Sequence, residues 1–484
     1  MSLARRAGRN ILFKALGEAG RFAWALLLIL VARGLGDEAL GRISFAYSFT
    51  YIFVLLTDLG LNILVVREVA RERGRAGQYL GNLLSIRLLS STVAFALIAG
   101  AIMLSGYPPE VVTVVLLFAG INLARGILEL YGAVFSGLEV MGREAVLKNL
   151  HQVSLFVSGG FALAVGCGTV GVAVGLLIGS VLVVVIGSGM VRRTIPLFRP
   201  LWDRALWLTL VRRALPLGIT VMFIVLFNES DIVLLSYLGH GEREVGWYAA
   251  ASRVMKMLQL IPMLVVTAVY PVFSDLARGP QGALSIAYRG TLKLLLMIAI
   301  PAAIVVAGLA QPLIHLVYGP GFGKAALPLR LLACSIPFVY VGYVLVNVLV
   351  SSDRTKLAAL ATGGAAVVNI TANLLLIPIF GIVGAALAAI AGQLSLVVIG
   401  AVAVERAVTV SRWFQLVSKP VVAGLAMVMA VGLMVQTSWW AVAFFAGLSI
   451  YLLVLGLTGA LREEEFMAVR RLWRRTEPYG VLNR

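Results

Sequence analysis

The stretch GWYAAASRVMKMLQLIPMLVV, residues 246–266, decides the class of fold. It is almost entirely apolar, and a helix of this length crosses a hydrocarbon core about 30 Å thick. Two cations, Arg253 and Lys256, nevertheless lie one helical turn apart inside it. Similar apolar runs recur along the whole chain, and they are continuous rather than alternating, which argues against a membrane β-barrel. The sequence therefore predicts an all-α polytopic membrane protein.

The composition supports this class of protein. Of the 484 residues, 61% are hydrophobic and only 13% are charged, whereas a soluble domain carries about 25% charged residues. The net charge of +18 lies mainly in short loops, where Lys and Arg set the orientation of the spans, so no nucleic-acid partner is expected. Cys167 and Cys334 lack the spacing of metal ligands. The basic N-terminus has no convincing cleavage site after its first apolar run, which favours a retained helix.

Hydropathy predicts about fourteen transmembrane helices, and the basic residues predict their orientation. With a cytoplasmic N-terminus, 30 of the 40 Lys and Arg residues fall in cytoplasmic segments and four in outer loops. This bias predicts a multi-pass protein of the cell (cytoplasmic or inner) membrane with both termini in the cytoplasm. The expected spans begin near residues 11, 43, 82, 111, 149, 171, 214, 247, 294, 326, 358, 384, 420 and 440.

Two pairs of segments indicate an internal repeat. LGDEALGRISFAYS (35–48) is similar to LGHGEREVGWYAAAS (238–252), and GTVGVAVGLLIGSVLVVV (168–185) is similar to FGIVGAALAAIAGQLSLVVI (380–399). Both offsets correspond to six spans, an even number, so the two copies have the same orientation. This predicts two parallel six-helix lobes, a transporter architecture. The predicted domains are an N-terminal lobe, 1–200, a C-terminal lobe, 201–410, and a segment, 411–484, with two additional transmembrane helices and a basic cytoplasmic tail.

Several motifs together resemble the polysaccharide-transporter (oligosaccharide flippase) family of the multidrug, oligosaccharidyl-lipid and polysaccharide exporter superfamily. They include ARGLGDEALGRISFAYSF (32–49), DLGLNILVVREVAR (58–71), FSGLEVMGREA (135–145), VGWYAAASRV (245–254) and NLLLIPIFGIVGAALAAI (373–390). The resemblance implies two six-helix lobes around a central cavity with two further C-terminal helices. It also implies a flippase that moves polyprenyl-pyrophosphate-linked oligosaccharide from the cytoplasmic to the outer leaflet.

Such a substrate carries a pyrophosphate, and its flippase needs cations deep in the membrane. Arg21, Arg253 and Lys256 are expected about 10–15 Å along their helices, near the bilayer centre. A buried charge persists where it faces a cavity or a partner, so these three residues are candidate substrate ligands. The alternative is that they pair with acids, Glu18 with Arg21, and Asp231 or Glu229 with Arg253. Pairing and ligand duty are not exclusive, because a pair can open when the ligand binds, so Glu18 and Asp231 are also candidate site residues.

A second candidate group lies on span 4. Asn122, Arg125 and Glu129 share one helical face by their spacing. This face either lines the lumen or forms an interhelical network, and the sequence leaves both open. Arg87, near the cytoplasmic end of span 3, is expected to snorkel toward water.

Four functions compete for this sequence. The first is the lipid-linked oligosaccharide flippase, and the second is an ion-coupled exporter of drugs or other small molecules with the same fold. A membrane enzyme would need a sizeable outer loop with catalytic residues, and a scaffold would not need midplane cations. The prediction is thus a non-enzymatic transporter without cofactor or metal, apart from a possible coupling ion, Na⁺ or H⁺. Its expected partners are the lipid-linked oligosaccharide, membrane lipids and possible glycosyltransferases or a polymerase of the same pathway.

Overall fold

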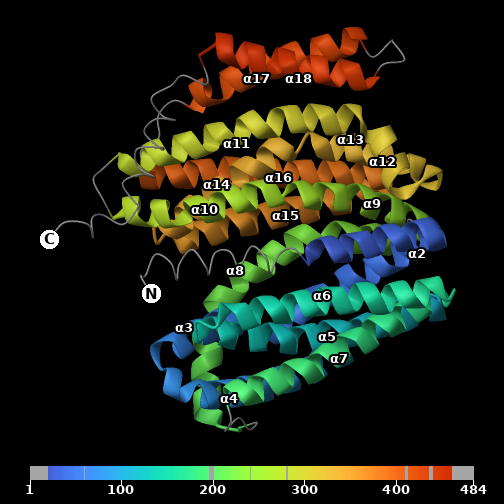
Figure 1. Cartoon of the computed structure of the whole chain (residues 1–484), viewed down its shortest axis with the longest axis vertical. Helices are drawn as coiled ribbons and strands as arrows, with labels where there is room; N and C mark the ends of the chain where they lie inside the picture. The colour runs from blue at the N-terminus through green and yellow to red at the C-terminus, as the bar shows by residue number, and fades with distance from the viewer. Residues whose placement is uncertain are drawn as a thin grey trace. The chain divides into compact units, whose positions relative to one another are not determined.

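The computed structural model describes residues 20–58, 60–195, 201–239, 241–278, 282–408, 413–434 and 440–459. In these ranges the chain forms seventeen α-helices and two short 3₁₀ helices, without a strand (Figure 1). This confirms the predicted all-α class. The predicted basic tail, at the end of 411–484, lies outside the described ranges.

The chain divides into two compact units, Met1–Ala249 and Ala250–Arg484. The first unit holds α2 (Arg21–Asp58), α3 (Leu61–Arg71), η1 (Arg73–Arg75), α4 (Ala76–Leu104), α5 (Pro109–Gly137), α6 (Met141–Ala164), α7 (Gly168–Thr194), α8 (Arg204–Tyr237) and the start of α9 (Glu242–Leu258). The second unit holds the rest of α9, α10 (Leu260–Ala277), α11 (Ala283–Gly308), α12 (Ala310–Tyr318), η2 (Pro320–Ala325), α13 (Ala326–Ala333), α14 (Ile336–Ser351), α15 (Thr355–Phe380), α16 (Ile382–Val408), α17 (Trp413–Met434) and α18 (Trp440–Leu457). The predicted division at residues 200 and 410 stays a prediction.

The α2 helix differs from the expected pattern of two spans joined by a loop. It runs from Arg21 to Asp58 with a single break at Gly36, which has φ 88° and ψ −172°. Glycine adopts this conformation without the penalty that a Cβ would bring. One residue therefore turns the chain where a loop of several residues was expected, and the helix resumes directly after it.

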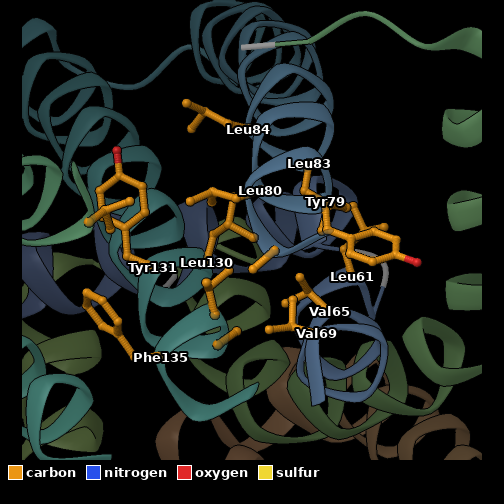
Figure 2. Close-up of a cluster of buried hydrophobic side chains, with 14 of the residues drawn as sticks. Leu61, Val65, Val69, Tyr79, Leu80, Leu83, Leu84, Leu130, Tyr131 and Phe135 are labelled. Atoms are coloured by element: carbon orange, nitrogen blue, oxygen red, sulfur yellow. The ribbon is translucent and has the colours of Figure 1, made fainter. Parts of the chain in front are cut away.

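The core of the first unit includes a cluster of apolar side chains from α3, α4 and α5. In α3 the buried residues Leu61, Leu64, Val65 and Val69 recur at helical spacing, so one face is apolar. Figure 2 shows Leu61, Val65 and Val69 of α3 with Tyr79, Leu80, Leu83 and Leu84 of α4 and Leu130, Tyr131 and Phe135 of α5. This packing holds α5 against α3 and α4.

In the second unit, α15 and α16 form a tight helical hairpin. Gly381 ends α15 with φ 55°, and a Cβ on Gly384 would lie 2.3 Å from the carbonyl oxygen of Leu376. The α17–α18 pair packs against α11, where the hydroxyl of Tyr451 donates to the carbonyl of Met297 at 3.0 Å. The two C-terminal helices thus attach to their unit through α11.

Seven helical segments in the described ranges are long and apolar enough to cross a membrane, or eight if one bent pair is a single span. Two shorter apolar helical segments, Val417–Val431 and Phe445–Leu457, lie in α17 and α18. A polytopic membrane protein is thereby confirmed, whereas the count of fourteen spans stays a prediction. The segments are Arg73–Leu104, Pro109–Gly137, Gly168–Thr194, Glu242–Ala277, Leu284–Gly308, Thr355–Phe380 and Ile382–Arg406, with Pro320–Ala333 and Ile336–Ser351 as the bent pair.

Candidate functional site

A cluster of aromatic and charged side chains joins α2 to α5 inside the first unit. Arg125 donates from Nε to Glu129 at 2.9 Å and from a terminal nitrogen to the hydroxyl of Tyr47 at 3.1 Å. Its guanidinium also lies over the ring of Tyr51, 4.9 Å from the centroid. The Tyr47 and Tyr51 rings stack at 5.5 Å, and Trp24 lies 6.0 Å from Tyr47. We call these five residues the aromatic cluster.

Helical spacing brings the members of the aromatic cluster together. Tyr47 and Tyr51 are four residues apart on α2, and Arg125 and Glu129 are four apart on α5, so each pair lies on one face of its helix. Trp24 precedes the break at Gly36 by twelve residues, and Tyr47 follows it by eleven. At 1.5 Å per residue, both rings therefore lie about 17 Å along their helix legs, which allows them to meet.

Asn122 lies on the same helix but in a different environment. Its side chain is 1% exposed and donates to the hydroxyl of Thr50 at 2.7 Å. This contact is an interhelical hydrogen bond of the kind found between membrane helices. The predicted face of α5 is therefore divided: Asn122 lies in the packed interior, whereas Arg125 and Glu129 keep side-chain exposures of 30% and 39%.

The acids on α8 also have partners inside the first unit. Asp231 accepts a hydrogen bond from the hydroxyl of Tyr248 at 2.7 Å, and Glu229 accepts one from Ser48 at 2.7 Å. Both carboxylates are buried. Burying a charge is costly unless it is hydrogen-bonded, so these contacts explain how α8 tolerates two acids. A role of Asp231 in binding substrate stays a prediction.

Arg87 corrects one expectation from the sequence. It does not snorkel: its side chain is 3% exposed, and it lies 3.4 Å from Asp58. The guanidinium also donates to Thr57 at 3.1 Å and to the carbonyl oxygen of Gly126 at 3.1 and 3.3 Å. Gly126 permits this approach, since a Cβ there would lie 3.2 Å from Nε of Arg87. The arginine ties α4 to α2 and α5 instead of reaching water.

The predicted cations of the second unit lie on α9. Arg253 and Lys256 are three residues apart and both are partly buried. They occur within Glu242–Ala277, a segment that qualifies as a membrane span. Arg21 is the first residue of α2, but its side chain is outside the described part of the structure, as is the whole of Glu18. Their predicted pairing and their role as ligands stay predictions.

The first unit also contains a close helix crossing that the sequence did not predict. A Cβ on Gly41 of α2 would lie 2.0 Å from the carbonyl oxygen of Glu242, and one on Gly246 of α9 would lie 2.1 Å from that of Asp37. Glu242 lies four residues before Gly246, and Asp37 lies four residues before Gly41, so the two contacts are reciprocal. Because real Cβ contacts are longer, only glycine fits at either position. Trp247 donates to Asp37 at 2.9 Å beside this α2–α9 crossing.

Ion pairs surround the α2–α9 crossing. Arg42 of α2 contacts Glu242 of α9 and Glu110 of α5, each at 2.5 Å, and Arg243 contacts Glu38 at 2.8 Å. The crossing residues come from the two segments whose similarity indicated the repeat. The sequence similarity identified these two segments as copies of a repeat, but it did not predict that they contact each other. Within the described ranges, no group of three or more His, Cys, Asp or Glu side chains could hold a metal ion.

Comparisons with known proteins agree with this architecture. The family model described as polysaccharide biosynthesis protein matches residues 8–277, and the MatE model matches residues 216–375. A probable low-salt glycan biosynthesis flippase, Agl15 from Haloferax volcanii, is 24% identical over 392 residues, 80% of each chain. A structure of the lipid II flippase MurJ in an inward closed conformation has a TM-score of 0.77 at 16% identity and covers 93% of this chain and 99% of that chain. An inward-facing multidrug resistance MATE family transporter of the MOP superfamily has a TM-score of 0.66 at 16% identity, with coverages of 83% and 100%.

Proposed function

Since the chain belongs to the polysaccharide biosynthesis protein family, we propose that it is a flippase for polyprenyl-pyrophosphate-linked oligosaccharide. It carries this substrate from the cytoplasmic to the outer leaflet by alternating access. The multi-pass helical fold supports a transport function, and the similarity to a probable glycan biosynthesis flippase supports a glycan substrate. The proposal includes no catalytic residue, because the substrate is moved without chemical change.

The pair of cations on α9 carries the proposal. A glycan cannot cross hydrocarbon unaided, and the pyrophosphate adds negative charge that must be balanced on the way. A charged residue at the centre of a membrane helix costs about 2.5–3.5 kcal/mol on insertion scales. Two partly buried cations one turn apart within Glu242–Ala277 are therefore expected to serve a ligand of opposite charge. Arg suits forked binding to phosphate, and Lys provides a point charge.

The α2–α9 crossing supports alternating access. Its Arg243–Glu38 ion pair is exposed, at 66% and 44%, whereas in the Arg42–Glu242 pair the side chains are 20% and 28% exposed. Exposed ion pairs each contribute only about 0–1 kcal/mol. Such contacts can break and re-form during a transport cycle, unlike the buried Arg87 network. In this proposal the crossing closes one side of the protein and opens in the other state.

A second candidate is an ion-coupled exporter of small molecules, which the match to the MatE model over residues 216–375 favours. That region includes Arg253 and Lys256. For either function, the proposed coupling ion is H⁺ or Na⁺. If the protein is a flippase, glycosyltransferases of the same pathway are its proposed partners. The two functions differ in their substrates, and this difference can be measured directly.

The test is a flipping assay with the full-length protein in proteoliposomes. A fluorescent polyprenyl-pyrophosphate-linked oligosaccharide is the first substrate and ethidium is the second. We expect Arg253→Ala and Lys256→Ala each to slow flipping of the first substrate by about tenfold or more, because one charge-assisted contact is worth about 1.5–3 kcal/mol. Arg354→Ala removes an exposed cation of the same unit and is expected to have no effect.

The outcomes separate the two functions. Transport of ethidium without movement of the lipid-linked oligosaccharide would overturn the flippase in favour of the exporter. Normal flipping by both α9 variants would remove the proposed pyrophosphate site. Gel filtration and thermal unfolding of each variant verify that a loss of activity is not caused by misfolding.

A further inference from the structure

The aromatic cluster has a position and an exposure that packing alone does not explain. Arg125 lies sixteen residues after Pro109, the first residue of α5, which is about 24 Å along the helix. That is well inside a membrane span, yet Arg125 is 30% and Glu129 39% exposed. Trp24, Tyr47 and Tyr51 are also partly exposed. Charges at this depth face a bundle interior or a water-filled space rather than lipid, so the exposed part of the cluster is expected to face one of these two.

The charges of the cluster balance each other. Arg125 is bound to Glu129 at 2.9 Å, and its guanidinium lies over the Tyr51 ring. The protein itself therefore satisfies both the carboxylate and the electron-rich ring face with its own cation. A phosphate would compete with Glu129, and a cationic ligand would compete with Arg125. The surface fits a neutral ligand better than either.

The remaining groups specify the chemistry of that ligand. Three aromatic rings in contact present apolar faces, and the guanidinium, carboxylate and phenol groups beside them are hydrogen-bond donors and acceptors. Binding sites for small molecules commonly combine aromatic walls with a few placed polar groups. A pyranose ring matches this combination, because one face carries C–H groups and its rim carries hydroxyls.

We propose that Trp24, Tyr47, Tyr51, Arg125 and Glu129 form a glycan subsite that binds one pyranose ring of the lipid-linked oligosaccharide. The proposal rests on the proposed flippase function and extends it, by assigning the sugar and the pyrophosphate to different residues. One sugar face packs against the part of the Trp24, Tyr47 and Tyr51 rings that remains exposed. Its hydroxyls accept hydrogen bonds from Arg125 and donate to Glu129.

The experiment compares two kinds of probe that differ only in the sugar. One is farnesyl pyrophosphate, and the others are farnesyl pyrophosphate bearing glucose, galactose or N-acetylglucosamine. Calorimetry measures the Kd of each for the full-length protein in nanodiscs. We expect at least one sugar-bearing probe to bind several-fold tighter than farnesyl pyrophosphate.

The variants then locate the source of this preference. Tyr51→Ala is expected to weaken binding of the preferred sugar-bearing probe by about three- to tenfold, the usual range for one aromatic contact. It is expected to leave the Kd of farnesyl pyrophosphate unchanged. Tyr51→Phe keeps the ring and is expected to retain most of the preference. Phe161→Ala removes a ring that is 70% exposed on α6, outside the cluster, and is expected to change neither Kd.

Each contrary result has a distinct meaning. Equal binding of all probes by the wild-type protein, or equal weakening of all probes by Tyr51→Ala, would overturn the glycan subsite while the flippase function stands. If none of the probes binds, the proposed function falls together with the subsite. If ethidium binds in their place and requires Tyr51 and Glu129, the cluster is a cation site.

Discussion

Arg87 on α4 and Arg125 on α5 show how the same residue type takes two roles among neighbouring helices. The Arg87 side chain is 3% exposed, and its donors are directed to Asp58, Thr57 and the carbonyl of Gly126. The Arg125 side chain is 30% exposed, with an acid and two phenol rings as neighbours. Loss of a partner of Arg87 would leave a buried charge without compensation, whereas the side chain of Arg125 remains accessible to a ligand. We therefore assign Arg87 to stability, whereas Arg125 stays a residue of the proposed glycan subsite.

The position of Gly126 gives a direct test of the role of Arg87. In Gly126→Ala the new Cβ would lie 3.2 Å from Nε and 3.4 Å from Cζ of Arg87, so the guanidinium must shift by a few tenths of an ångström, which is expected to weaken its hydrogen bonds to the Gly126 carbonyl. Because this arginine is buried, we expect Gly126→Ala to destabilise the protein by about 1–3 kcal/mol. Thermal unfolding in detergent measures the change. Gly160→Ala on α6, where a Cβ would meet nothing within 4 Å, is the matched control and should leave stability unchanged or raise it by up to about 1 kcal/mol. Equal melting temperatures for the two variants would contradict the assignment.

At the scale of elements, the α2–α9 crossing depends on two helices approaching backbone to backbone. Gly41 and Gly246 each face the carbonyl four residues before the other, so the contact is reciprocal. Small residues let membrane helices approach closely in this way. The same approach positions Arg42 between Glu242 and Glu110. The glycines therefore determine whether the ion pairs can form.

A single methyl group is expected to open this crossing. In Gly41→Ala the Cβ would lie 2.0 Å from the carbonyl oxygen of Glu242, which forces the helices apart. With Cys167 and Cys334 replaced by Ser, a short bismaleimide should join Glu38→Cys to Arg243→Cys in the parent and only at background level after Gly41→Ala. Gly100→Ala on α4 adds a methyl group in open space and should not alter the cross-link. An unchanged cross-link in Gly41→Ala would show that the crossing is not held by the glycine contact.

The sequence predicted the elements better than their contacts, for a physical reason. Hydropathy reports that a segment is apolar and long, so the all-α membrane class followed from it directly. It does not report which residues meet across helices: Tyr47 and Arg125 are 78 positions apart, and no periodicity links them. Arg87 was predicted wrongly because its position suggested a route to water, whereas its surroundings supplied an acid, a hydroxyl and a carbonyl. Gly36 turned the chain in one residue, which no hydropathy window resolves.

At the scale of the whole molecule, the distribution of basic residues predicts which side of the membrane each end faces. Lys and Arg are retained on the cytoplasmic side, and 30 of the 40 fall on one side under the predicted topology. This orientation is needed by the proposed function, since the substrate must be taken from the cytoplasmic leaflet. It also assigns the α2–α9 crossing to the outer side, because Asp37 and Glu242 lie in segments predicted there.

Reporter fusions test the orientation without reference to transport. A fusion after residue 107 or after residue 240 is expected to be active only outside the cytoplasm, and one after residue 203 only inside it. The third site is surrounded by Arg192, Arg193, Arg199, Arg204, Arg212 and Arg213, so neutral substitutions there should weaken its cytoplasmic retention. The control is neutral substitution of Arg33 and Lys324, which are predicted to lie in outer loops. These substitutions should not weaken the cytoplasmic retention of the third site. An outer signal at 203 in the unaltered chain would reverse the topology. It would also move the α2–α9 crossing to the cytoplasmic side, where its closure would shut off the leaflet that supplies the substrate.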